Sequence, residues 1–244
     1  MTEFQWNFFS DFRREFKEKI SLWSVFSKEL KLLQEKSAEN DKIPYYQIEN
    51  PVVYNRALDE ISNESEIKLI VCADNPGKNE QLSQNQKYLI GQAGKLAEGF
   101  FRNNKEFKID FRKNAIILNK TPIHSAKTSQ LKFIYKNSSD EIRNLLDETQ
   151  KWMAKKTAEL SDALNSPIFL AGYSELKKGG IFTLYKNELK NSIKNIDSVL
   201  VFQHFSMNRF SIDFKNFMQN NPNLSKEEAL IKIGLLHQKE IFDF

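Results

Sequence analysis

Compact polar side chains follow several short apolar runs of this sequence. Asp74 and Asn75 come after the first run, Asn119 after the second and His204 after the fourth. A carboxylate, two amides and an imidazole offer hydrogen-bond donors, acceptors and a group that exchanges protons near neutral pH. Such a set suits the binding and conversion of a polar substrate, provided that the fold brings these residues together.

The apolar runs predict the sheet that would position these residues. They are continuous, rich in β-branched and aromatic residues and too short for helices, as is typical of strands buried on both faces of a parallel sheet. The runs are Lys68–Cys72, Ala115–Leu118, Ile168–Ala171 and Val199–Phe202, and the helical stretches between them are Gln92–Asn103, Ser139–Leu164 and roughly Glu175–Ile193. This alternation predicts an α/β fold, a three-layer α/β/α sandwich around a four-stranded parallel sheet. Ligands of such folds bind beyond the carboxyl ends of the strands, where the polar residues lie.

The sequence before and after this region is expected to be helical. Apolar residues recur at steps of three and four from Phe9 to Leu33, which predicts a long amphipathic helix that packs on the core. A short helix is expected over Val52–Ile61, and a helix from Ser211 to the end, with a capping box at Ser225–Glu228. We expect one domain over residues 1–244, of which 1–50 are an N-terminal helical extension.

Composition excludes several classes of protein. The only cysteine among the 244 residues is Cys72, so the chain forms neither an internal disulfide nor a four-cysteine metal cluster. The first residues lack the pattern of a signal peptide, and no apolar stretch approaches the 18 residues of a membrane span. We expect a cytoplasmic monomer without a membrane partner. The net charge of +4 is too small to indicate a polyanionic partner by itself.

Four motifs occur in order between Ile67 and Ile212 and carry a resemblance to a known family. They are Ala-Asp-Asn-Pro-Gly at 73–77, Leu-Ile-Gly-Gln-Ala-Gly-Lys-Leu at 89–96, Asn-Lys-Thr-Pro at 119–122 and His-Phe-Ser at 204–206. They resemble the Gly-x-Asn-Pro-Gly, Phe-Val-Gly-x-Ala-Gly-x-Leu, Asn-x-Cys-Pro and His-Pro-Ser motifs of the uracil-DNA glycosylase superfamily. The likeness is to its mismatch-specific, single-strand-selective and iron–sulfur branches, without the iron–sulfur cluster.

The resemblance implies a role for each polar residue. Hydrolysis of the bond between a base and deoxyribose develops positive charge on the sugar and negative charge on the departing base, which is flipped out of the stack. His204 would donate a hydrogen bond to O2 of the pyrimidine. Asn75 would hold the attacking water, with Asp74 as an auxiliary, and Asn119 would pair with O4 and N3–H of uracil.

The resemblance also implies a base pocket and a DNA surface, with no metal and no organic cofactor. The further base-binding residues would be Tyr88, Leu89, Pro76, Gly77 and Gly91, and the DNA-binding residues Ser125, Lys127, Ser206, Met207, Asn208 and Arg209. Nine Lys or Arg residues lie between Arg102 and Lys136, which could form part of a surface for phosphates. His124 could line the same rim as Asn119.

Three departures from the family motifs leave other functions open. Ala73 replaces the first glycine, Leu89 takes the place of the aromatic residue that stacks on the base, and Phe205 replaces the proline of His-Pro-Ser. Tyr88 could substitute for the stacking residue. One alternative is a member of the same superfamily that binds nucleic acid or bases without cleaving them, and another is a different α/β hydrolase of nucleotide-like substrates.

Overall fold

The computed structural model describes residues 1–242 of the chain. Its strands are β1 (Leu69–Ala73), β2 (Ala115–Asn119), β3 (Ile168–Ala171) and β4 (Val199–Phe202). Its helices are α1 (Glu3–Trp23), α2 (Ser27–Asn40), α3 (Gln92–Asn103), α4 (Gln130–Asn137), α5 (Asp140–Leu164), α6 (Thr183–Ser192), α7 (Arg209–Asn220) and α8 (Lys226–Phe242). Over this range, no helix combines the length and the apolar character needed to cross a bilayer.

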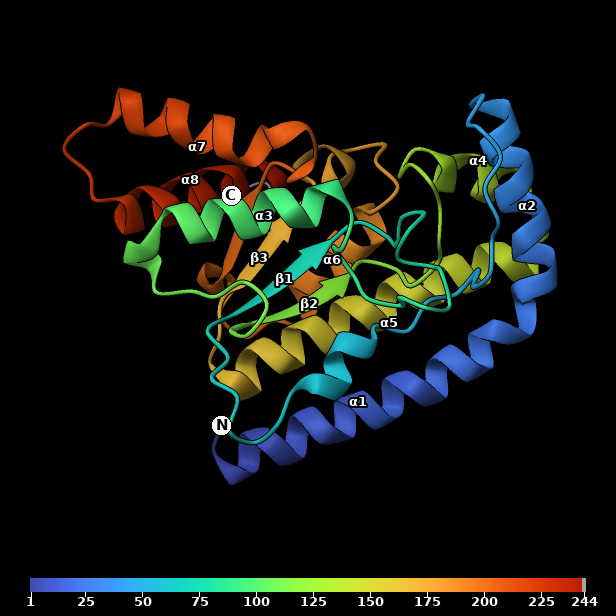
Figure 1. Cartoon of the computed structure of the whole chain (residues 1–244), viewed down its shortest axis with the longest axis horizontal. Helices are drawn as coiled ribbons and strands as arrows, with labels where there is room; N and C mark the ends of the chain where they lie inside the picture. Colours follow the sequence, from blue (N-terminus) through green and yellow to red (C-terminus); the bar gives the residue numbers. More distant parts are fainter. Residues whose placement is uncertain (243–244) are drawn as a thin grey trace.

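The four strands form one parallel sheet in the order β2-β1-β3-β4, which confirms the predicted fold class (Figure 1). Ala73 is the register partner of Asn119 across the pair β1–β2, and Ala171 is the partner of Phe202 across β3–β4. The carboxyl ends of all four strands therefore lie along one edge of the sheet, so the residues that follow them are neighbours.

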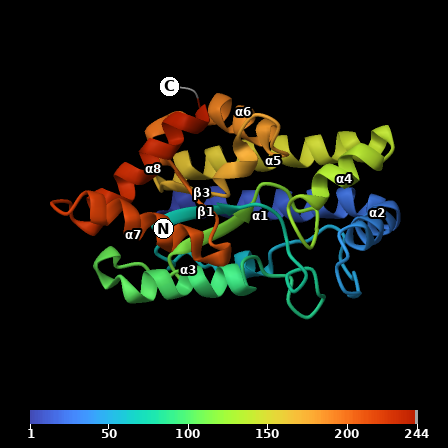
Figure 2. The same cartoon turned by 90° about the horizontal axis from the view of Figure 1, so that it is seen from above.

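Alternate residues of each strand pack into two separate cores. On β1, Ile70 and Cys72 point into a core that includes α1, α2, α4, α5 and α6, whereas Leu69, Val71 and Ala73 point into a core with α3, α7 and part of α8. Viewed from above, α3 lies on one side of the strands and α5 and α6 on the other (Figure 2). Because both faces are covered, the strands are continuously apolar, as predicted.

The N-terminal segment folds against the core as predicted, but as two helices rather than one. A 3-10 turn at Ser24–Phe26 separates α1 from α2, and the chain changes direction there (Figure 1). The α1 side chains Phe12, Phe16 and Trp23 pack against Trp152 of α5, with ring centroids 6.1, 5.4 and 5.6 Å apart. The aromatic stripe is thus part of the core on the α5 side of the sheet.

Other boundaries differ from the prediction where turn-forming residues interrupt the helical pattern. The helix α6 begins at Thr183 instead of Glu175, because Gly179 (φ 79°) and Gly180 form a turn before it. The predicted C-terminal helix is split into α7 and α8 next to Pro222, while the capping box of Ser225 and Glu228 forms as expected. The stretch Val52–Ile61 contains only a 3-10 turn at Arg56–Glu60, and α4 was not predicted.

Candidate functional site

A cavity of about 460 Å³ lies beyond the carboxyl ends of β1, β3 and β4. It contains most of the site residues expected from the sequence. Those that line it are Asp74, Asn75, Gly77, Leu89, Gly91, Ser125, Lys127, His204, Ser206, Met207 and Arg209. Pro76, Tyr88, Asn119 and Asn208 are not among the lining residues. The strand ends thus bring the Asp-Asn and His segments together.

A larger cavity of about 850 Å³ lies elsewhere, along the outer edge of β2. Its lining includes Glu66, which precedes β1, and Asn114 and Ala115 at the start of β2. It does not contain His204, Asp74 or Asn75. Because ligands of open α/β folds bind at the opposite ends of the strands, the smaller cavity is the candidate site.

His204 is held as a neutral imidazole whose ring proton is on Nε2. The backbone N–H of Ser206 donates to Nδ1 at 3.1 Å, and the Ser206 hydroxyl lies 2.7 Å from the same atom. A backbone amide only donates, so Nδ1 must be the acceptor and the ring proton sits on Nε2. Burial lowers the pKa of His204, and the nearby Lys120 ammonium acts in the same direction while Asp74 opposes it. At neutral pH the ring therefore offers an uncharged N–H donor at the cavity wall.

Asn75 is oriented so that its amide oxygen is free for a ligand. Its Nδ2 donates to the carbonyl oxygens of Pro76 and Ser125, both at 3.1 Å, and to the Ser125 hydroxyl at 2.9 Å. Carbonyl oxygens only accept hydrogen bonds, so the amide atom that faces Pro76 and Ser125 must be the nitrogen. Within residues 1–242 nothing hydrogen-bonds Oδ1, and Asn75 lines the cavity. The oxygen can accept a hydrogen bond from a water molecule.

His124 does not line the cavity; it is buried behind the Asn75–Pro76 segment and binds its backbone. It is fully buried, its Nδ1 lies 2.8 Å from the carbonyl oxygen of Pro76, and its Nε2 lies 3.0 Å from the Tyr46 hydroxyl. Burial lowers the pKa of His124 to about 4. The neutral ring therefore donates to Pro76 and accepts from Tyr46, which makes it a structural residue.

Asp74 is held by contacts from three directions. The buried ammonium of Lys120 donates to Oδ1 at 2.6 Å, and the Thr128 hydroxyl donates to Oδ2 at 3.1 Å. Gly172, which follows β3 with φ 90°, approaches so closely that a Cβ there would lie 2.2 Å from Oδ1. The carboxylate is thus fixed at the cavity wall by residues that follow β2 and β3.

Asn119 and Tyr88 are buried beside the cavity and do not reach into it. Asn119 is 1% exposed, and neither atom of its amide has a hydrogen-bond partner among the described residues. As the register partner of Ala73, a wall residue, it lies on the same face of the sheet as the cavity wall. Tyr88 is completely buried and donates to the carbonyl oxygen of Val53, so Leu89 alone of this pair borders the cavity.

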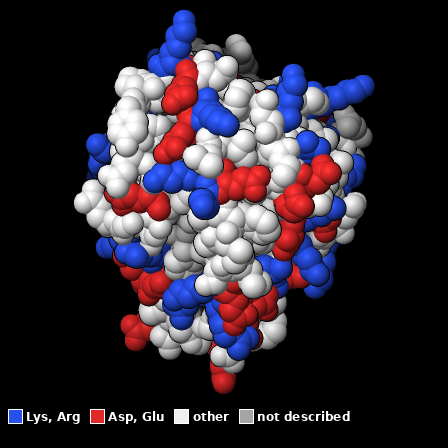
Figure 3. All heavy atoms as spheres, turned by 90° about the vertical axis from the view of Figure 1, so that its right-hand side faces the viewer, with Lys and Arg blue, Asp and Glu red and all other residues white. Residues whose placement is uncertain are grey.

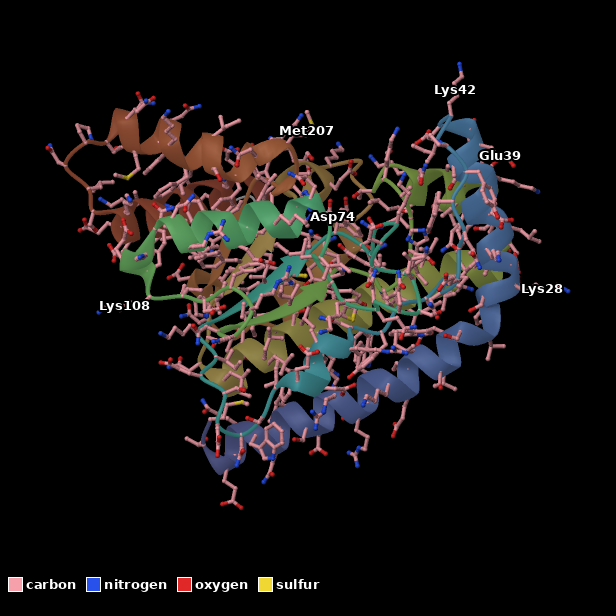
Figure 4. All side chains as sticks on the ribbon, viewed as in Figure 1. Lys28, Glu39, Lys42, Asp74, Lys108 and Met207 are labelled. Atoms are coloured by element: carbon pink, nitrogen blue, oxygen red, sulfur yellow. The ribbon has the colours of Figure 1, made fainter. Side chains whose placement is uncertain are left out.

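The residues expected to contact DNA divide into two groups. The Ser125 and Ser206 hydroxyls are engaged within the site, with Asn75 and His204. Lys127, Met207, Asn208 and Arg209 are exposed, and Met207, 75% exposed, and Asn208 have φ of 54° and 57°. Non-glycine residues rarely adopt such left-handed backbone. In Figure 4 Met207 lies above Asp74, near the start of α7, and both residues line the cavity.

Most of the basic stretch lies away from this cavity. The 12 residues of α3 span about 18 Å, and its first turn borders the cavity. Arg102, Lys105 and Lys108 line a separate hollow at the far end, and Figure 4 shows Lys108 remote from Asp74. Basic and acidic side chains are interspersed on the face shown in Figure 3. Arg102, Lys105 and Lys108 therefore lie outside the cavity, because α3 leads the chain away from it.

Glu80 is a titratable cavity residue that was not predicted. Its side chain is 8% exposed, lines the cavity and accepts a hydrogen bond from the Gly77 amide at 3.3 Å. Burial raises the pKa of Glu80 to about 7, against the opposing effect of backbone amides and Arg112. Its only signal in the sequence is its place three residues after Gly77, where a carboxylate can close the turn.

Replacing Glu80 with Gln should change how stability depends on pH. Because the pKa of this carboxyl rises from 4.5 to about 7 on folding, its protonated form favours the folded state, and that stability is lost as pH rises through this range. Between about pH 5.5 and 8, wild type should lose about 2 kcal/mol relative to Glu80→Gln. Urea unfolding at the two pH values measures this difference. A constant difference would contradict the assignment.

Comparison with known proteins adds no relative. The chain matches no family model, no curated protein and no solved structure.

In the described part of the chain, no three His, Cys, Asp or Glu side chains are grouped so that they could hold a metal ion. A function must therefore be inferred from the cavity and its side chains.

Proposed function

We propose that this chain is a DNA glycosylase that hydrolyses the N-glycosidic bond of uracil or a related damaged base. The observation that supports this most is the pairing of His204 with Asn75 and Asp74 in one cavity. His204 offers a neutral N–H donor, Asn75 an amide oxygen and Asp74 a carboxylate. Hydrolysis of this bond needs a donor for the departing base and acceptors for water and developing positive charge.

In the proposed reaction, water adds to C1′ of the deoxyribose while the bond from C1′ to the base nitrogen breaks. The electron pair of that bond leaves with the base, which carries a negative charge at first. The water loses a proton when it adds to C1′, and a proton taken up by the base gives the neutral product. His204 Nε2 donates to O2 of the pyrimidine as negative charge grows there. Asn75 Oδ1 orients the water, and the Asp74 carboxylate stabilises the positive sugar.

Asn119 would recognise the base in this proposal. A buried amide without partners is costly, and O4 and N3–H of uracil complement its donor and its acceptor. Because Asn119 does not border the cavity, binding must open the wall that separates them. A flipped base would also need apolar contact, for which Leu89 is placed at the wall.

One observation favours a second candidate, a protein that binds bases or nucleic acid without cleaving them. Apart from the His204 imidazole, no aromatic ring among residues 1–242 lines the cavity. Flipped bases are commonly held by stacking on aromatic side chains. A site without such a ring would hold the base less firmly in the position that cleavage requires.

Incubation with labelled oligonucleotides that contain uracil or other damaged bases distinguishes the two candidates. The glycosylase leaves abasic sites, which break on alkaline treatment. Single-stranded and double-stranded substrates should be compared, together with a strand that carries thymine at the same position. Binding without alkali-labile sites in any strand would favour the second candidate.

DNA binding by this surface should weaken with salt in a way that depends on Lys127. Its side chain is 54% exposed, and the residue borders the cavity. Lys127→Ala should reduce the slope of log affinity against log salt by about one unit, because one phosphate contact is lost. Filter binding at several salt concentrations measures the slope.

Lys105→Ala is the matched control, because Lys105 lies in the hollow at the far end of α3. It should leave the slope unchanged. Equal slopes for wild type and both variants would exclude Lys127 from the DNA surface.

A further inference from the structure

Lys120 is a completely buried lysine directly behind the candidate site. It follows β2, and its side chain has no exposed surface. Its ammonium donates to Asp74 Oδ1 and to the carbonyl oxygen of Ala171 at the end of β3. It also lies 5.1 Å from the centroid of the Phe182 ring. One side chain thus connects the ends of three strands.

The burial of this charge has to be compensated. An ammonium removed from water is tolerated when an oppositely charged partner and further acceptors surround it. Within residues 1–242, Asp74 is the only carboxylate that forms an ion pair with Lys120, and it also lines the cavity. The buried Lys120 ammonium and the Asp74 carboxylate at the cavity therefore stabilise each other.

The arrangement leaves part of the Asp74 carboxylate available. An ionised carboxyl group has about four acceptor positions. Lys120 occupies one on Oδ1 and Thr128 one on Oδ2. The missing side chain of Gly172 lets Oδ1 lie close to the end of β3. Rotation of the carboxylate is restrained from both oxygens, while acceptor positions remain for a ligand in the cavity.

We propose that Lys120 is a positioning residue for Asp74: it holds the carboxylate at the cavity wall, in the orientation in which it stabilises the positively charged sugar. This inference rests on the proposed glycosylase function. Lys120 itself does not meet the substrate, because it is fully buried behind the carboxylate. It is therefore distinct from a lysine that attacks the sugar.

A double-mutant cycle tests whether Lys120 acts through Asp74. Lys120→Met should lower kcat for a uracil-containing strand by roughly 10- to 100-fold and change KM by less than about threefold. In a protein that already carries Asp74→Asn, adding Lys120→Met should change kcat by less than about threefold, because the group that Lys120 positions is gone. An equal loss in both backgrounds would overturn the proposal, because a purely structural role would act in each.

Urea unfolding of the same variants gives a readout that does not depend on catalysis. Lys120→Met leaves the Asp74 charge without its partner and should lower the unfolding midpoint, whereas adding Asp74→Asn should restore part of the loss. Additive changes in the midpoint would contradict the pairing. If wild type cleaves no strand, the proposed function fails while this cycle still decides whether the two residues are coupled.

Two further comparisons keep the result clear. Lys156→Met removes a lysine of α5 that pairs with Glu15 and Glu159 outside the cavity, and should leave kcat unchanged. If Lys120→Met alone does not fold, the comparison of Asp74→Asn with the double variant remains. Equal kcat values for these two support the proposal, and a much lower value for the double variant overturns it.

Discussion

His204→Ala is expected to slow base release by roughly 100-fold or more, which corresponds to about 3 kcal/mol of transition-state stabilisation. The imidazole offers an Nε2–H donor because the Ser206 amide occupies Nδ1 and because burial lowers the pKa of the ring. This donor matters most when negative charge has developed on the base, so DNA affinity should change little. Single-turnover cleavage and equilibrium binding measure the two quantities.

Ser206→Ala is a milder change at the same site, and its cleavage rate is compared with that of His204→Ala. It removes the hydroxyl next to Nδ1 but keeps the backbone amide that fixes the tautomer. Its effect on the rate should be less than about tenfold, since one neutral hydrogen bond contributes about 1 kcal/mol. Cleavage at the wild-type rate by His204→Ala would remove His204 from the mechanism.

Phe16→Ala is expected to lower the free energy of unfolding by about 3–5 kcal/mol, the largest stability effect that we predict. Phe16 is fully buried, and its ring centroid lies 5.8 Å from that of Phe12, 5.4 Å from that of Trp152 and 5.5 Å from that of Tyr54. Truncation leaves a cavity between α1 and the main core. Urea unfolding measures the loss.

Phe4→Ala provides a matched control on the same helix. Phe4 is 67% exposed, so the same substitution should change the free energy of unfolding by less than about 0.5 kcal/mol. If Phe16→Ala has an equally small effect, or if α1 unfolds in a separate transition, the N-terminal helices are not part of the domain core.

The sheet was predictable because its signal is local and strong. Each strand is a short apolar run buried on both faces, and all four were placed within one residue of their observed bounds. The helix α4 was missed because it is short and its two buried apolar residues, Leu131 and Ile134, lie within the basic stretch. The bend at Ser24–Phe26 was missed because the apolar spacing continues across it.

The part of the site that directly follows the strands was predictable from the sequence. The topology places Asp74, Asn75 and His204 at one cavity, as the positions after β1 and β4 indicate. Side-chain contacts that depend on tertiary packing were not predictable. No local pattern shows that the Lys120 ammonium would bind the Asp74 carboxylate, or that the Tyr88 hydroxyl would donate to the carbonyl oxygen of Val53.

The alternation of side chains within a strand could have refined the prediction. Leu118 points toward the α5 side of the sheet, so Asn119 points toward the α3 side and Lys120 returns to the α5 side. Lys120 indeed lies near Phe182, which belongs to the core on the α5 side. The same alternation places Asn119 on the same face of the sheet as Ala73 and predicts that it lies beside the cavity.

Quantification of free base by mass spectrometry tests the central claim most directly. Wild-type protein is incubated with a uracil-containing strand, and free uracil and abasic sites are counted in the same sample. We predict equal amounts of both, with neither produced from a matched thymine strand and at least roughly 100-fold slower release by His204→Ala. If no free base appears from any uracil- or lesion-containing strand while the protein still binds DNA, the glycosylase proposal is contradicted.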